Sequence, residues 1–118
     1  MTGEAVHELS IAKGIIELVA DEKRARGFER VLSISLCVGE YSGVVPECLR
    51  EFFPYAAQGS PAEGAALSFT PLKAEFTCGD CAYSGVVDRR IARCPECGGA
   101  ALKMTRGREF YVESLTVE

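Results

Sequence analysis

The segment that decides the fold is Cys78-Gly-Asp-Cys81 followed by Cys94-Pro-Glu-Cys97, in a chain of 118 residues. Two residues separate the cysteines within each pair, and twelve residues separate the pairs. Two intervening residues let both thiolates of a tight turn face one ion, and two such turns complete a tetrahedron. The pattern therefore predicts a closed metal site that holds a small module together.

Zn²⁺ is the expected occupant, because four soft thiolates with no open position suit a structural site. Iron in a rubredoxin-like setting uses the same spacing and stays open as the alternative metal. Two disulfides, or a redox-active pair, are the interpretations without a metal. The paired spacing is more typical of metal sites, and no signal segment directs the chain to an oxidising compartment. Gly79, Gly98 and Gly99 are expected to give the turns their positive φ.

The composition is that of a globular chain. Hydrophobic residues make up 47%, and thirteen Lys and Arg against seventeen Asp and Glu leave a net charge of −4. A nucleic-acid reader normally carries a basic excess, and no apolar run approaches the length of a membrane span. We therefore expect no nucleic-acid or membrane partner and a cytoplasmic location. Cys37 and Cys48 lie outside the pairs and are expected to be small buried side chains.

The residues before the cysteine pairs predict alternating helices and strands. One amphipathic helix is expected from about His7 to Arg26, followed by a strand over residues 31–39 with apolar residues at every second position. A second helix is expected from Pro46, with a kink or an early end at Pro54. The buried side chains of these helices are predicted to be Leu9, Ile11, Ala12, Ile15, Ile16, Leu18, Val19, Leu49, Phe52 and Phe53.

Alternation then predicts two more strands around the metal module. One runs from Leu67 to about Leu72, and the last covers residues 109–118 with a bulge that reconciles two apolar phases. The module has room for a short hairpin over residues 83–91. The prediction is an α+β fold in which two helices cover one face of a three-stranded sheet, with an inserted zinc-ribbon-like module. The domains would be residues 1–74 with 106–118, and residues 75–105.

His7 is the only histidine of the chain and is followed by Glu8. A single histidine near a terminus is most often solvated and has no further role. The functional interpretation is an open metal site, because imidazole is a good ligand for Ni²⁺ or Cu²⁺ and neighbouring amide nitrogens can complete a square-planar set. Such a site could release its ion, unlike a closed thiolate cage.

A set of motifs, in the same order from His7 to the C-terminus, resembles the HypA family. These motifs are His7-Glu8-Leu9-Ser10, the apolar helix after it, Gly39-Glu40, Ser42-Gly43-Val44-Val45-Pro46-Glu47, the paired cysteines, and Ser114-Leu115-Thr116-Val117-Glu118. Members of that family are nickel-insertion accessory proteins for the maturation of [NiFe]-hydrogenase, and some also serve urease. The resemblance implies a metallochaperone and not an enzyme.

The resemblance also implies site residues and partners. His7 would be the principal nickel ligand and Glu8 a further ligand or modulator, so that nickel is the transferred ion. Zinc would be structural, and its ligands would be Cys78, Cys81, Cys94 and Cys97. The implied partners are the GTPase HypB, the hydrogenase large-subunit precursor and, where urease is the client, urease accessory proteins.

The chain departs from the family pattern at its beginning. Six residues precede His7, where the family has one. A free α-amine titrates near neutrality and can bind metal, whereas an amide nitrogen within a longer chain is a far weaker acid. We therefore expect the natural protein to begin at Val6, which occupies the slot of the family's initiator Met. Three alternatives from other classes are a zinc-ribbon nucleic-acid binder, a rubredoxin-like electron carrier and a structural adaptor.

Overall fold

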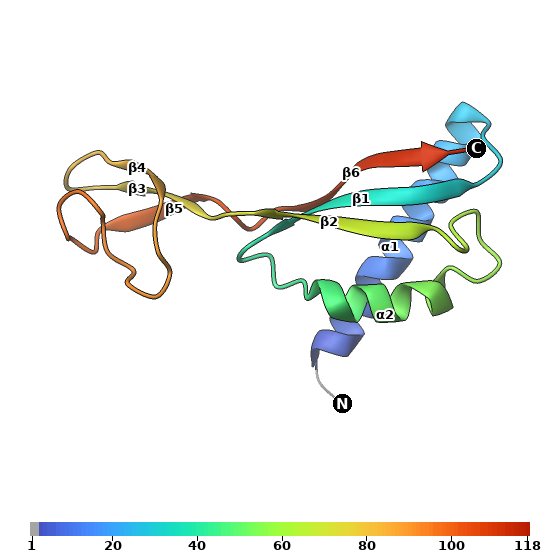
Figure 1. Cartoon of the computed structure of the whole chain (residues 1–118), viewed down its shortest axis with the longest axis horizontal. Helices are drawn as coiled ribbons and strands as arrows, with labels where there is room; N and C mark the ends of the chain where they lie inside the picture. The colour runs from blue at the N-terminus through green and yellow to red at the C-terminus, as the bar shows by residue number, and fades with distance from the viewer. Residues whose placement is uncertain (1–2) are drawn as a thin grey trace.

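The computed structural model describes residues 3–118, with side chains from Glu8 onward. Figure 1 shows how the helices and strands of these residues follow one another. In chain order they are α1 (Gly3–Arg26), β1 (Val31–Gly39), α2 (Pro46–Ala56), β2 (Ala66–Leu72), β3 (Glu75–Cys78), β4 (Ser84–Val86), β5 (Leu102–Arg106) and β6 (Phe110–Val117). The class is α+β, and the predicted three-stranded sheet with two helices is confirmed.

The first sheet has the strand order β2-β1-β6. β1 pairs with β2 in parallel, from Ser33 opposite Ala66 to Gly39 opposite Leu72, and α2 supplies the crossover that parallel strands need. β6 returns antiparallel on the other side of β1, with a register shift where Ser35 and Leu36 face Ser114 and Val112. The predicted bulge in the last strand is therefore confirmed.

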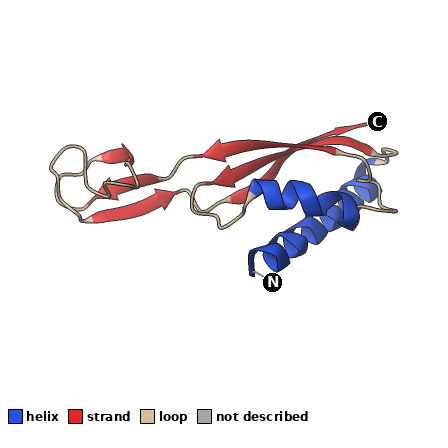
Figure 2. Ribbon diagram, turned by 60° about the horizontal axis from the view of Figure 1, so that its bottom comes forward, coloured by secondary structure: helices blue, strands red, loops and turns tan. Residues whose placement is uncertain are grey.

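Both helices cover the same face of this sheet, as Figure 2 shows. Apolar residues at helical spacing in α1 and α2 meet the alternate residues of β1, because these periods place them on one face of each element. The buried core that results consists of Ala12, Ile15, Val19, Val31, Ile34, Leu36, Leu49, Phe53, Ala57, Ala62 and Leu67. Five residues predicted in this core are not fully buried: Leu18 is 38% exposed, and the half-buried ones are Leu9, Ile11, Ile16 and Phe52.

The second sheet has the order β4-β3-β5 and was not predicted. β3 pairs antiparallel with β4 and with β5. The expected hairpin within residues 83–91 is wrong, because β4 pairs with β3 across the first cysteine turn and not with residues after it. We call residues 75–106 the cysteine module, and residues 3–72 with 110–118 the helix–sheet body.

Two chain segments, residues 73–74 and 107–109, form the neck between these parts. A Cβ added at Gly39 would lie 2.3 Å from the carbonyl oxygen of Gly107, so only glycine allows the chains to approach here. Glu40 Oε1 accepts a hydrogen bond from the N–H of Ala74 at 2.9 Å, and the Tyr41 N–H donates to the Gly107 carbonyl at 2.7 Å. The neck is thus packed against the loop that follows β1.

Two local predictions need correction. α2 continues through Pro54 and ends at Ala56, so the proline lies in the last turn of the helix and does not end it at once. A proline lacks the N–H that would bond to the carbonyl four residues earlier and so disfavours a longer helix, and α2 ends two residues after Pro54. Cys37 is 3% exposed as expected, whereas Cys48 is only half-buried.

Candidate metal centres

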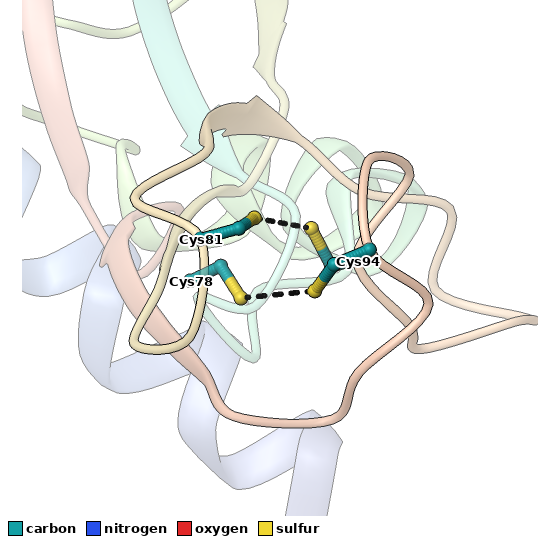
Figure 3. Close-up of side chains that lie close together, drawn as sticks. Cys78, Cys81 and Cys94 are labelled. Carbon is teal, nitrogen blue, oxygen red and sulfur yellow. Dashed lines mark hydrogen bonds between the residues drawn. The ribbon is translucent and has the colours of Figure 1, made fainter.

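The four paired cysteines converge at the end of the cysteine module. Their Sγ atoms all lie within 4.8 Å of one another (Figure 3). Cys78 Sγ is 3.8 Å from Cys97 Sγ, and Cys81 Sγ is 3.4 Å from Cys94 Sγ. A tetrahedral zinc with Zn–S bonds of about 2.3 Å needs sulfurs about 3.8 Å apart, whereas a disulfide needs about 2.05 Å. The donor set therefore fits a metal and not two disulfides.

The two cysteine turns repeat one hydrogen-bonding scheme. The N–H of Asp80 donates to Cys78 Sγ, and the N–H of Glu96 donates to Cys94 Sγ, both at 3.4 Å. The fifth residue of each turn, Ala82 or Gly98, donates to the carbonyl of the first cysteine, with φ of 65° and 74°. Amide donors stabilise thiolates, so each turn is built to present charged sulfur to a cation.

The predicted glycine roles hold for one of three positions. Gly98 has the expected positive φ, but Gly79 and Gly99 do not. Gly79 instead donates its N–H to the Ala101 carbonyl at 2.8 Å, which ties the first turn to the segment before β5. A Cβ at Gly99 would lie 3.1 Å from Asp80 Oδ2 and 3.3 Å from Cys97 Sγ, so close approach of the two turns favours glycine there.

The thiols of the cluster differ in acidity. Burial disfavours the thiolate of Cys94, but the backbone N–H groups of Cys97 and Glu96 lower its pKa to about 7. The backbone at Tyr83 favours the thiolate of Cys81, but the Cys94 side chain and burial raise the pKa of Cys81 to about 12. A divalent cation that binds all four sulfurs must therefore displace protons from the cluster as it enters.

Glu8 lies apart from the cysteines, at the N-terminal half of α1. Its side chain is 0% exposed, and Oε2 accepts a hydrogen bond from the N–H of Val45 at 2.9 Å. Val45 is the N-cap residue of α2 and makes no capping bond with its own side chain. No sequence pattern indicates this pair, because the partners are 37 residues apart and the donor is a backbone group.

The His7 side chain falls outside the described ones. α1 begins at Gly3, so the helical backbone includes His7 directly before Glu8. Among the side chains of residues 8–118, the cysteine cluster is the sole convergence of three or more potential metal ligands. The nickel-ligand roles of His7 and Glu8 stay predictions.

Two side chains of the cysteine module, Arg89 and Phe76, reach the helix–sheet body. The Arg89 guanidinium carbon lies 4.8 Å from the ring centroid of Tyr41, and Arg89 Nη1 lies 3.8 Å from Glu40 Oε2. The Tyr41 ring in turn meets the Phe76 ring edge-on, with centroids 6.5 Å apart. The loop after β1 is therefore held by the neck, by Phe76 of β3 and by the loop between the cysteine pairs.

An open groove of about 430 Å³ lies away from both centres. It runs between the C-terminal half of α1 and β6, where Leu18, Phe28 and Leu115 line it. It brings together none of the predicted site residues. None of the helices in residues 3–118 has the length and hydropathy of a membrane span.

Comparisons with known proteins agree with this architecture. The family model described as "Hydrogenase/urease nickel incorporation, metallochaperone, hypA" matches residues 6–117. A hydrogenase maturation factor HypA from Chlorobium limicola is 38% identical over 113 residues, which cover 96% of this chain and 97% of that protein.

Solved structures share the fold at lower identity. The solution structure of a HypA protein superposes with a TM-score of 0.72 at 21% identity, covering 96% of this chain and 97% of the other. The solution structure of the Ni metallochaperone HypA from Helicobacter pylori superposes with a TM-score of 0.68 at 20% identity, covering 93% of this chain and 96% of the other. A match along nearly the whole of each chain means that the body, the neck and the cysteine module occur together in these relatives.

Proposed function

The chain belongs to the HypA family of hydrogenase/urease nickel incorporation metallochaperones, and from this premise we propose that it delivers Ni(II) during the maturation of a [NiFe]-hydrogenase. The observation that carries the proposal is the family match over residues 6–117, which takes in both His7 and the four cysteines. The names of its curated relatives, hydrogenase maturation factors, favour hydrogenase as the client. Urease is a second client under the family description.

The division of labour follows from the two donor sets. Cys78, Cys81, Cys94 and Cys97 would hold a resident zinc, since four converging sulfurs leave no open position for a substrate. When bound, zinc supplies a fixed cross-link between the two turns and no reactive chemistry. We propose residues 75–105 as the zinc-binding domain, and residues 1–74 with 106–118 as the nickel-binding domain.

Nickel is the cargo, and its proposed principal ligand is His7. Imidazole and backbone nitrogens suit Ni(II) in a square-planar set, and such a site exchanges its ion more readily than a closed thiolate cage. Protons compete with the ion for these nitrogens, so nickel affinity would fall as pH falls. A delivery protein needs an ion that is held specifically but released to its client.

Partners and compartment follow as part of the same proposal. The receiving partners would be the GTPase HypB and the hydrogenase large-subunit precursor. Four thiols that must stay reduced to bind zinc favour the reducing cytoplasm. Binding of each partner to the nickel-loaded and nickel-free chain, measured by calorimetry, would show which of them depends on the cargo.

Metal stoichiometry tests the proposal directly. Elemental analysis and calorimetric titration with Ni²⁺ would be applied to this chain, to the chain starting at Val6, and to each with His7→Ala. We expect a stoichiometric nickel site that His7→Ala abolishes, with zinc content unchanged. If this chain and the chain starting at Val6 both hold zinc but take up no nickel, nickel delivery is refuted.

A further inference from the structure

We propose that Glu8 is a positioning residue of the nickel site and not a nickel ligand: its buried carboxylate caps α2 through Val45 and so fixes the part of α1 that carries His7. This inference rests on the proposed function, because it concerns the same site. Among the described side chains, Glu8 is the charged residue in the buried set. A buried carboxylate is costly unless it serves bonds that repay its desolvation.

The bond from Val45 closes a helix end that the local sequence leaves open. In a capping box, the carboxylate or amide of the N3 residue accepts from the N-cap N–H. Here the N-cap is Val45, and the residue three positions later is Cys48, which offers no such oxygen. Glu8 supplies the acceptor from another helix, at 2.9 Å from the Val45 nitrogen.

Charge favours the same arrangement. The N-terminus of a helix carries partial positive charge, and a carboxylate there is stabilised, most strongly where solvent is excluded. Glu8 is 0% exposed and lies at the start of α2, so its negative charge is placed where the helix dipole favours it. The Glu8 side chain thus has a role at this position without any metal.

The consequence for nickel is geometric. His7 immediately precedes Glu8 in α1, so a fixed Glu8 fixes the His7 backbone relative to residues 44–46. The loop before Val45 is itself held, since the Val44 N–H donates to Ser42 Oγ at 3.2 Å and the Tyr41 N–H to Gly107. Pre-organised ligands bind an ion more tightly than ligands that must be ordered first.

Two substitutions at Glu8 separate positioning from ligation. Glu8→Gln keeps an oxygen that can accept from Val45, whereas Glu8→Ala removes it. We expect Glu8→Ala to weaken Ni²⁺ binding about tenfold, the factor that corresponds to 1.4 kcal/mol, and Glu8→Gln to stay within about threefold. The visible d–d spectrum of bound nickel should be unchanged in Glu8→Gln. Glu17→Ala and Glu17→Gln, at an exposed position of the same helix, are the matched controls.

A third substitution tests the bond from its other end. Val45→Pro removes the donor N–H and leaves the Glu8 carboxylate intact. Proline prefers a φ of about −65° and Val45 has φ −102° and ψ 106°, so the backbone must shift slightly to accept it. If Glu8 is a positioning residue, Val45→Pro should weaken nickel binding as Glu8→Ala does. Zinc content and thermal melting of each variant establish that the chain is folded before nickel is added.

The possible results have distinct meanings. If Glu8→Gln loses as much nickel affinity as Glu8→Ala and shifts the spectrum, while Val45→Pro binds normally, Glu8 is a ligand and the inference is wrong. If all three variants bind nickel as the unaltered chain does, the cap is only structural and the inference is also wrong. An unaltered chain that takes up no nickel would instead refute the proposed function.

Discussion

The helix–sheet body and the cysteine module are stabilised in different ways. The body buries a continuous apolar core in which side chains such as Phe53, Ile34, Leu36 and Leu49 are at most 2% exposed. In the module the buried hydrophobic residues are Cys78, Val87 and Cys94, and two of these are predicted metal ligands. Burial of apolar area drives folding in the first part, whereas so small a core cannot do so in the second.

The difference shows how one short chain can combine a self-supporting scaffold with a part that depends on an ion. The module's strands are only three to five residues long, too short for an isolated sheet of this size to be stable. The body needs no such help, because β1 is paired on both sides and covered by both helices. Changes in each part should therefore have separate effects.

Removal of the metal should produce the largest effect. Structural zinc contributes about 10–16 kcal/mol of apparent free energy in small zinc modules, far more than the module's own core can supply. We expect chelation to remove amide hydrogen-exchange protection from β3, β4 and β5, while β1 and α2 stay protected. Protection of β3–β5 that survives complete removal of zinc would show that the module folds without it.

The same contrast explains what could be predicted from sequence. Hydrophobic periodicity predicts elements that bury an apolar face, and it located β1, α2, β2 and β6 correctly. It missed β3 and β5, because these strands form by pairing around the cysteine turns and do not bury a stripe of apolar residues. Val87, the remaining buried side chain of the module, lies outside all of its strands.

The candidate sites divide along the same line. The cysteine cluster is a local pattern, so the spacing of the pairs was enough to predict that four sulfurs would meet. The cap formed by Glu8 on Val45 and the approach of Arg89 to Glu40 and Tyr41 join residues far apart in sequence. Such contacts depend on the tertiary arrangement, which no single segment encodes.

A core truncation in the body should have the next largest effect. Phe53 is 2% exposed, and Phe→Ala changes at such sites cost about 3–5 kcal/mol through lost burial and the cavity left behind. We expect Phe53→Ala to lower the free energy of unfolding of the body, measured by guanidinium denaturation, with zinc content unchanged. Phe52→Ala, at the half-buried neighbouring position, is the control and should cost clearly less. Equal losses would contradict the packing described for α2.

Substitutions at the two residues with a left-handed backbone conformation should change zinc binding by the cysteine module only. Their effect should be smaller than that of Phe53→Ala on the body. Ala82 and Gly98 occupy equivalent positions with φ of 65° and 74°. An L-residue in this region costs about 1–2 kcal/mol relative to glycine, and a Cβ at Gly98 would have open space, so backbone strain is the expected term. Gly98→Ala should weaken zinc binding, and Ala82→Gly should offset it, in competition titrations with a chelator. Weakening by both substitutions would show that the two turns are not equivalent.

The smallest effect on stability, and the sharpest test of how the two parts are held together, is expected from Arg89→Ala. The Arg89 side chain is 56% exposed and its ion pair with Glu40 is 3.8 Å long, so its loss should cost only about 0.2–1 kcal/mol. Arg89 is nonetheless the module side chain that lies over Tyr41 in the helix–sheet body. Residual dipolar couplings should therefore show wider motion of the module relative to the body in Arg89→Ala. Arg90→Ala, whose ion pair with Asp88 stays within the module, is the control, and the same motion in both variants would mean that the neck and the Phe76–Tyr41 contact set the orientation without Arg89.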